Sequence, residues 1–577
     1  MHTQVLRPGT QSIAKLMIFL FICIFSAILT PSALADNFFI DALKTPGESS
    51  PEPPTEVLVN FYLEHPLEVN EPYVRDTRTL NIDSFVPKMT YTNLYRYRNT
   101  DNVITWIMPI PYSSSVDVYL NFPKESGVTT AWMNDTELKT DIPVTVKATE
   151  LAEIKICNST NRGIVRFVFS TMPMISITYD EKPEKDSDTP AHIIIADPEF
   201  REHGYETGYF ESDAVISKRG QSSARFYEKY PLNISFMKDG EKYDHSVLGM
   251  REDSDWILDS AYADASRVRN RVLLDLWSEI YRLPWSESKS GAPEGVFTEV
   301  YINNRYHGIY AFSEKQDRKQ VGLKKVSKGG TGTMFKTRAT NSDKESPAGF
   351  VSMGSEMPGD VSNTTWLNVE MKYPKADDAT LDMWKDFYDM TKLVVDGSDE
   401  EFVQNIQKYV DLDNLSKYFL FINIFDVTDN MRKNMTFVRH DEGDPYQLVP
   451  WDLDASLGRY YSSKKSRTYD YSSNALFDRL LNLNVDGFYE KTIKTWNEYK
   501  DTHFSTDNLM KHIRSYTNRF ISCNAHDREY SLYPEFEHYL GDNYRYIFKI
   551  PREVEYIEEY TNEHRAFFED ELMKLSK

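Results

Sequence analysis

The hydrophobic pattern of this chain changes along its length, and this change constrains the fold more than any other feature. Short runs of β-branched and aromatic residues, many of them bounded by Pro, Gly or Asn, recur from residue 57 to about residue 302. Helical periodicity appears at 264–282 and dominates from about 376 to the end. Strands followed by a mostly helical half predict an α+β architecture, because each kind of element must bury its own apolar face. We expect the later part to form two lobes.

Two polar stretches divide the chain. Residues 44–56 (KTPGESSPEPPTE) are typical of a linker, and residues 180–190 form a second break. Between them, alternating runs predict an antiparallel, β-sandwich-like domain over 57–175. Its clearest strands are expected at Val57–Tyr62, Val103–Ile110, Val116–Phe122 and Ile164–Phe169.

The first 35 residues have the pattern of a secretory signal peptide. Arg7 and Lys15 precede an apolar run at 16–28, and Ala33 and Ala35 supply small residues at the cleavage positions. We expect cleavage after Ala35, a linker over 36–56 and an exported protein located in the periplasm or at the cell surface. An uncleaved anchor is the alternative, although the run is short for a spanning helix. No later segment is apolar enough to span a bilayer.

Charge and cysteine content exclude several classes of protein. The chain has 66 Lys and Arg against 88 Asp and Glu, a formal net charge of −22, which disfavours nucleic acid as a partner. Three cysteines are too few for a disulfide scaffold or a structural zinc site. Cys23 leaves with the signal peptide, whereas Cys157 and Cys523 remain and could pair in an oxidising compartment.

The most informative segment begins with an apolar, helix-like run at 415–425. Asp429 follows it, Asn434 comes five residues later, and a strand-turn-strand stretch then leads to Trp451-Asp452-Leu453-Asp454. Metal-assisted phosphoryl transfer needs these groups in this order: one acid to accept the proton of the attacking hydroxyl, then an Asn and a second acid to hold magnesium over the phosphates. An acidic turn or a calcium site would also use these residue types.

Three further segments offer weaker signals. Arg219-Gly220-Gln221-Ser222-Ser223 is a small-residue turn whose backbone amides could approach an anion, and Lys229 before the next strand could reach a phosphate. Asp264 to Asn270 precedes an apolar helix. Residues 300–315 predict a hairpin that ends at Glu314. Each of these patterns also occurs in ordinary surface turns, helices and strand ends.

Taken in this order, the segments resemble the CotH kinase family of secreted or surface-associated proteins with an atypical protein-kinase-like fold. The resemblance covers about residues 174–577 and rests on the 219–223 turn with its following Lys, Asp264…Arg269-Asn270, Tyr306-x-Gly308-x-Tyr310-x-x-x-Glu314, Asp429…Asn434, and Trp451-Asp-Leu-Asp454-x-Ser-x-Gly458.

The resemblance implies a kinase-like domain over 176–577, with one lobe at about 190–375 and a helical lobe at about 376–577. It implies a role for each of a set of residues: Asp429 as the catalytic acid, Asn434, Asp452 and Asp454 at the metal, and Arg219, Gly220, Ser222, Ser223, Lys229, Glu314 and, as a second candidate lysine, Lys336 at the nucleotide. The chain departs from ordinary kinases in lacking a Gly-x-Gly-x-x-Gly loop and a His-Arg-Asp motif, and it has Leu457 where the family usually has Phe.

The resemblance therefore implies an extracytoplasmic kinase that uses ATP with Mg²⁺ or Mn²⁺ to phosphorylate Ser or Thr of a secreted or envelope protein. The acidity of the chain favours a basic or Ser-rich substrate. The alternative is a non-catalytic surface or coat module. Glycoside hydrolysis by paired carboxylates is a third hypothesis, but no motif pair in the sequence fits it better than phosphoryl transfer.

Overall fold

The computed structural model describes five strands between residues 55 and 121 and most of the chain from 129 to 575. Of the strands before residue 122, and of residues 156–157, 162–167 and 169, only the backbone is described. The gaps after residue 129 are 134, 140–141, 143, 148–149, 151, 158–161, 201, 207, 304, 339–344, 358–363, 467–468, 470 and 540–544. The predicted signal segment at 1–35 lies outside the described residues.

Two sheets form the N-terminal β-rich region, and strands occur where the sequence predicted them. The first has the order β2-β1-β5-β8 and the second β3-β4-β10-β9-β6-β7. Their bounds are β1 Thr55–Phe61, β2 Leu80–Asn81, β3 Tyr95–Arg98, β4 Ile104–Pro109, β5 Ser115–Asn121, β6 Thr130–Met133, β7 Thr136–Glu137, β8 Val144–Lys147, β9 Ala152–Cys157 and β10 Arg162–Ser170.

The expectation of a purely antiparallel region was wrong. The pairs β1–β5 and β4–β10 are parallel, and the remaining pairs are antiparallel. A parallel pair needs a long crossover connection, and the stretches from β1 to β5 and from β4 to β10 both provide one. Packing of the two sheets into a sandwich stays a prediction.

A closed barrel follows directly. Seven strands pair in the order β13-β12-β11-β17-β18-β16-β14, and β13 also pairs with β14, which closes the ring; β15 extends from β14. All neighbours are antiparallel except β11 and β17. The bounds are β11 Met174–Thr178, β12 Thr189–Ala196, β13 Tyr209–Lys218, β14 Leu232–Lys238, β15 Glu241–Lys242, β16 Asp255–Asp259, β17 Gly295–Ile302 and β18 Arg305–Glu314. The predicted hairpin at 300–315 is confirmed as β17–β18.

Beside the barrel sheet, the part of the chain after residue 170 has a five-stranded antiparallel sheet with the order β20-β21-β19-β22-β23. The predicted strand-turn-strand stretch before Trp451 is confirmed as its β22–β23 hairpin. The bounds are β19 Thr333–Arg338, β20 Thr365–Trp366, β21 Val369–Tyr373, β22 Lys433–Arg439 and β23 Gln447–Val449.

Helices dominate the rest of the chain, as predicted. They are α2 Ser222–Phe226, α3 Arg269–Ile280, α4 Asp382–Asp396, α5 Asp399–Asn405, α6 Leu412–Ile424, α7 Ala475–Asn482, α8 Phe488–Tyr499, α9 Thr506–Ser522, α10 Ala525–Leu532 and α11 Ile550–Lys574, with a short hairpin of β24 Glu535–Glu537 and β25 Arg545–Ile547. Asp411 caps α6 by accepting a hydrogen bond from the Asn414 amide, which satisfies one of the free donors of the first turn. None of the helices in the described part of the chain has both the length and the apolar character needed to cross a bilayer.

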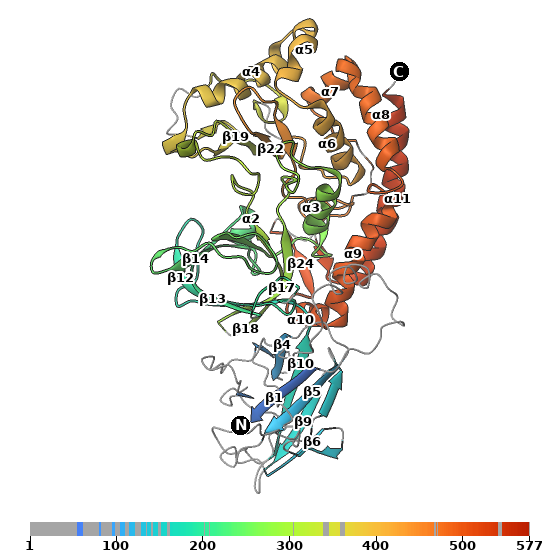
Figure 1. Ribbon diagram of the computed structural model, residues 1–577. Coiled ribbons are helices and arrows are strands. Elements are labelled where there is room, and N and C mark those ends of the chain that lie inside the picture. The colour runs from blue at the N-terminus through green and yellow to red at the C-terminus, as the bar shows by residue number, and fades with distance from the viewer. Residues whose placement is uncertain are drawn as a thin grey trace, which may run out of the picture.

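Two separate groups of buried apolar side chains stabilise the part after residue 170. One fills the barrel, with Ile193, Ile234 and Phe312 among its members. The larger one joins the helices to the five-stranded sheet and extends to the outside of the barrel, where Phe297 packs edge-on against Phe520 of α9. Figure 1 shows β19, β22 and the helices α4–α8 on one side and the barrel on the other, with α11 running alongside.

A buried carboxylate ties α10 to the barrel. Glu529 Oε1 accepts hydrogen bonds from Lys229 Nζ and Arg267 Nε, both at 2.8 Å, and Oε2 accepts from the Ile309 amide at 2.8 Å. Gly308 makes room for this carboxylate, because a Cβ at this position would lie 2.2 Å from Oε2. Cys523, which precedes α10, is free and buried; the side chain of Cys157 lies outside the described residues, so pairing of the two stays a prediction.

Candidate active site

The turn after α6 presents Asp429. α6 is almost wholly buried, and its last turns hold the chain that follows: the Val427 amide donates to the Ile422 carbonyl and Tyr418 Oη donates to the Asn430 carbonyl. Asp429 remains partly exposed, and its Oδ2 lies 3.1 Å from Lys433 Nζ. An apolar helix therefore fixes the position of a carboxylate whose described side-chain partner is one lysine.

The β22–β23 hairpin brings Asn434 and Asp452 together. Thr436 pairs with Val449 across the hairpin. Asn434, two residues before Thr436, and Asp452, three residues after Val449, therefore meet at the open end of the hairpin. Asn434 Nδ2 donates to Asp452 Oδ2 at 3.2 Å. Both residues have a φ of 61°, a left-handed conformation that Asn and Asp adopt more readily than other residues with a side chain. Two oxygen-bearing side chains from distant positions thus face each other.

Asp454 lies close enough to several acids to be affected by them. Burial, followed by repulsion from Asp452, Asp259 and Asp429, raises the pKa of Asp454 well above its ordinary value. Lys433 opposes this shift. A group of acids that repel one another is the environment that a divalent cation would stabilise.

Besides Lys433, two further cations lie next to these acids. The Arg219 guanidinium is 5.6 Å from the centre of the Trp451 ring and Lys336 Nζ is 5.3 Å from it. Burial lowers the pKa of Arg219 although Asp259 and Asp452 attract its charge. Burial likewise lowers the pKa of Lys336 to about 7, against the attraction of Asp452.

The turn that carries Arg219 has the predicted small-residue geometry. Gly220 has a φ of 94°, and a Cβ there would lie 2.1 Å from Ser223 Oγ. Ser222 begins the short helix α2, and its Oγ is 3.5 Å from Tyr539 Oη. Only glycine fits this backbone without strain.

Two residues predicted at the nucleotide are engaged elsewhere. Lys229 is fully buried and binds Glu529 and the Ile309 carbonyl. Glu314 is buried as well, where its Oε1 accepts from Arg251 Nε at 2.6 Å and its Oε2 from the Glu294 amide at 3.1 Å. Of the two lysines predicted at the nucleotide, Lys336 is the one whose pKa is affected by Asp452.

Asp259 and Asn270 were not among the predicted site residues, yet both lie against the acids. Asn270 Nδ2 donates to Asp259 Oδ2 at 3.1 Å, and Asn270 Oδ1 accepts from the Leu453 amide at 3.0 Å. The available signal was an acid at the end of an apolar strand, Trp256–Leu258, and an Asn at the start of a helix. Both patterns are too common to single out a site without the fold.

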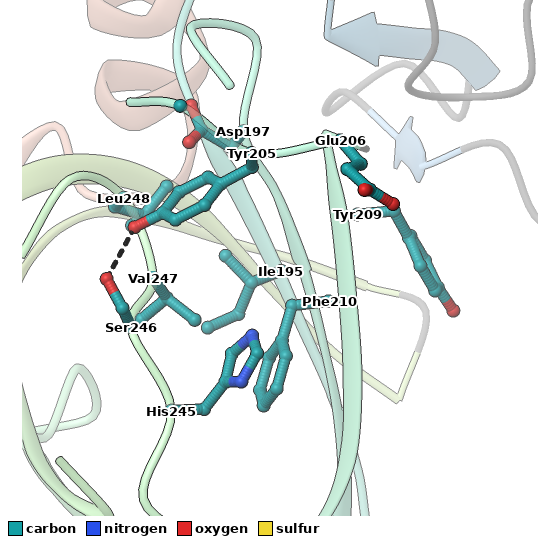
Figure 2. A pocket seen from close by; sticks show the side chains of 11 residues that line it. Ile195, Asp197, Tyr205, Glu206, Tyr209, Phe210, His245, Ser246, Val247 and Leu248 are labelled. Carbon is teal, nitrogen blue, oxygen red and sulfur yellow. Dashed lines mark hydrogen bonds between the residues drawn. The ribbon is translucent and has the colours of Figure 1, made fainter. Parts of the chain in front are cut away.

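A hollow of about 340 Å³ lies elsewhere, at the edge of the barrel. Its wall includes the stacked rings of Phe210 and His245, whose centres are 4.5 Å apart. Tyr205 and Ser246, which also line it, share a hydrogen bond of 2.8 Å between their hydroxyl oxygens (Figure 2). Its lining does not include Asp429, Asp452 or Asp454. The hollow is therefore separate from the candidate active site.

An α+β chain that gathers carboxylates, an amide and three cations around one turn has side chains of the kinds that bind cations and phosphates. The sequence from 216 to 568, between the end of β13 and α11, matches the family model described as CotH kinase protein. The chain belongs to this family. It is also similar to the inner spore coat protein H of Bacillus subtilis (strain 168), with 27% identity over 249 residues. That alignment spans 43% of this chain and 59% of the relative.

A nucleotide held by Lys336 would bind with a pH dependence of predictable direction. Its pKa of about 7 means that the free protein carries this charge below pH 7 and loses it above. Because only the ammonium form attracts phosphate, we expect the affinity for ATP to fall by up to about tenfold per pH unit above pH 7, one proton being linked to binding. Lys336→Arg keeps its charge over this range and should flatten the profile.

This prediction is checked by measuring the Kd for ATP between pH 6 and 9 for both proteins. Titration of ATP itself is common to the two profiles and cancels in their ratio. Parallel profiles for the wild type and Lys336→Arg would show that Lys336 does not contact the phosphates.

Proposed function

We propose that this chain is an extracytoplasmic, metal-dependent protein kinase that transfers the γ-phosphoryl group of ATP to Ser or Thr of a secreted or envelope protein. The observation that carries the proposal is the contact between Asn434 and Asp452 beside Asp429. These residues offer the acid, the amide and the second acid that phosphoryl transfer requires. Membership of the CotH kinase family supports the same assignment.

The residues fit a hard divalent cation. Asp452 is exposed and Asn434 is within 3.2 Å of it; half a turn of the Asn434 amide presents its oxygen in place of its nitrogen. Mg²⁺ is usually held by one or two carboxylates together with substrate phosphates, so Asp452, Asn434 and, next to them, Asp454 would hold Mg²⁺ or Mn²⁺. The bound ion would neutralise charge on the β- and γ-phosphates.

The remaining roles belong to groups of the chain itself. Arg219 and Lys336 bind the phosphates from the side of the Trp451 ring, and the amides of the turn at Gly220–Ser223 approach them closely. Asp429 accepts the proton of the attacking hydroxyl, and Lys433 holds its carboxylate in place before the substrate arrives.

The substrate and location follow from charge and from the relative. A formal net charge of −22 favours a basic or Ser-rich protein over an acidic one. The relative is described as an inner spore coat protein, which supports export to a surface layer, in agreement with the signal peptide predicted at 1–35.

Phosphoryl transfer is tested by incubating the purified chain with γ-labelled ATP and Mn²⁺ or Mg²⁺, wild type beside Asp452→Ala. The wild type is expected to label itself or a Ser-rich basic protein, and the variant is expected to lose this activity because it lacks the cation ligand. If the wild type labels neither, and neither protein shows a thermal shift with ATP, the chain is a non-catalytic coat or surface module instead.

A further inference from the structure

Asn270 connects two parts of the site that are far apart in the sequence. Its amide nitrogen reaches Asp259 at the end of β16, and its amide oxygen reaches the backbone of Leu453, the residue between Asp452 and Asp454. Asp259 in turn accepts the Ala261 amide on its other oxygen, Oδ1, at 3.0 Å. One side chain therefore links the barrel to the turn that carries both acids.

The start of α3 is held rigidly enough for Asn270 to act as a fixed point. Its neighbour Arg269 is fully buried, and its Nε donates to the Ser456 carbonyl at 3.0 Å and its Nη2 to Glu553 of α11 at 2.6 Å. Asp264 accepts from Arg269 Nη1 at 2.5 Å. Asn270 thus extends from a framework that is hydrogen-bonded to the chain just after the same turn, at Ser456.

We propose that Asp259 and Asn270 form a positioning pair that holds the Asp452-Leu453-Asp454 turn in the conformation needed to bind the divalent cation. This inference rests on the proposed function. Acids that repel one another separate unless something else fixes the backbone between them, and a hydrogen bond to the Leu453 amide does this. Groups that orient cation ligands typically contribute 10- to 100-fold to affinity or activity.

The two residues can be exchanged to test the pair. In Asn270→Asp, the new carboxylate still accepts the Leu453 amide but places an oxygen against Asp259 Oδ2. In Asp259→Asn, the new amide oxygen still accepts the Ala261 amide, but its nitrogen meets the nitrogen of Asn270. The double variant Asp259→Asn with Asn270→Asp restores the hydrogen bond between the two side chains with donor and acceptor reversed. It leaves the bonds from the Ala261 and Leu453 amides as they are, and it keeps the net charge.

We expect each single variant, in the full chain, to weaken Mn²⁺ binding in the presence of ATP by about 10- to 100-fold, and the double variant to recover most of that loss. Mn²⁺ affinity is measured by titration of the electron paramagnetic resonance signal of the free ion. The rate of γ-phosphoryl transfer should fall through kcat at fixed Mn²⁺ and recover at high Mn²⁺. Asn482→Asp, an exposed Asn on α7, is the matched control and should behave as the wild type.

A second readout needs neither metal nor activity. Hydrogen exchange of the peptide around Leu453, in the metal-free chain, should be faster in both single variants and return to the wild-type rate in the double variant. The proposed positioning pair would be overturned if the single variants bound Mn²⁺ as tightly as the wild type. It would also be overturned if the double variant bound Mn²⁺ no more tightly than Asn270→Asp. A wild type that binds no Mn²⁺ but shows the expected exchange pattern would instead overturn the proposed function while the hydrogen-bonded link stands.

Discussion

Replacing Asp429 by asparagine is expected to lower kcat for phosphoryl transfer by about 10²- to 10⁴-fold, the usual contribution of a general base. The amide has the size of the carboxylate but cannot take the proton of the incoming hydroxyl. The KM for ATP should change little, because Arg219 and Lys336 hold the phosphates. The fold should survive, since the described side-chain bond of Asp429 is one contact with a partly exposed lysine, Lys433.

The effect is measured from initial rates at saturating ATP and cation, with thermal unfolding as a check on the fold. Asp413→Asn is a suitable control, since Asp413 lies on α6 with its side chain 76% exposed and pairs with Lys491. If Asp429→Asn retained wild-type kcat, Asp429 would not be the base and its place after α6 would be structural.

Replacing Glu529 by glutamine is expected to cost about 3–5 kcal/mol of stability, the typical loss when one partner of a buried ion pair is removed. Lys229 and Glu529 have no exposed side-chain surface and Arg267 has 1%. Lys229 and Arg267 bring the pKa of Glu529 below its ordinary value even though burial alone would raise it. Glutamine keeps the shape but leaves the buried Arg267 guanidinium and the buried Lys229 amine, whose pKa burial lowers to about 7, without an anion, so α10 should separate from the barrel at lower denaturant concentration.

Chemical denaturation followed by tryptophan fluorescence measures this loss. Adding Lys229→Met to Glu529→Gln should recover part of it, because one of the two unpaired buried polar groups is removed. The neighbouring Glu535→Gln breaks a half-exposed pair with Arg545 and should cost at most about 1 kcal/mol. Equal losses for Glu529→Gln and Glu535→Gln would show that the buried group does not hold α10 in place.

Local patterns predicted most individual elements. The apolar run before Asp429 is α6, because a continuous apolar run of this length suits a buried helix. The two apolar runs on either side of Asn303 are the β17–β18 hairpin, because Asn is typical of the turn between two strands. The sequence also predicted a strand-turn-strand stretch between Asn434 and Asp452. The structure brings these two residues into contact.

Long-range pairing could not be predicted in the same way. Closure of the barrel depends on β13 pairing with β14 across the intervening α2, and β1 lies parallel to β5. Periodicity reports which face of a strand is buried but not which strand lies beside it. An antiparallel region was therefore expected where two pairs are parallel.

The candidate site shows the same limit at the level of single side chains. Lys229 was a reasonable phosphate contact by its position before a strand, but its surroundings are set by Glu529, 300 residues away. Asn270 belongs to a motif that carries the family resemblance, but its role was not predicted because it depends on Leu453, 183 residues away. Residue types and spacing indicated the acids, whereas the groups that hold them depend on the tertiary structure.

The most direct test of the central claim uses two samples of ATP, labelled on the γ- or on the α-phosphate, incubated with the chain, Mn²⁺ and a Ser-rich basic protein. The account predicts that only the γ-label enters protein, that it is recovered as phosphoserine or phosphothreonine, and that Asp452→Ala abolishes it. Incorporation of the α-label would show nucleotidyl transfer, and incorporation of neither label by folded wild-type protein would contradict a kinase.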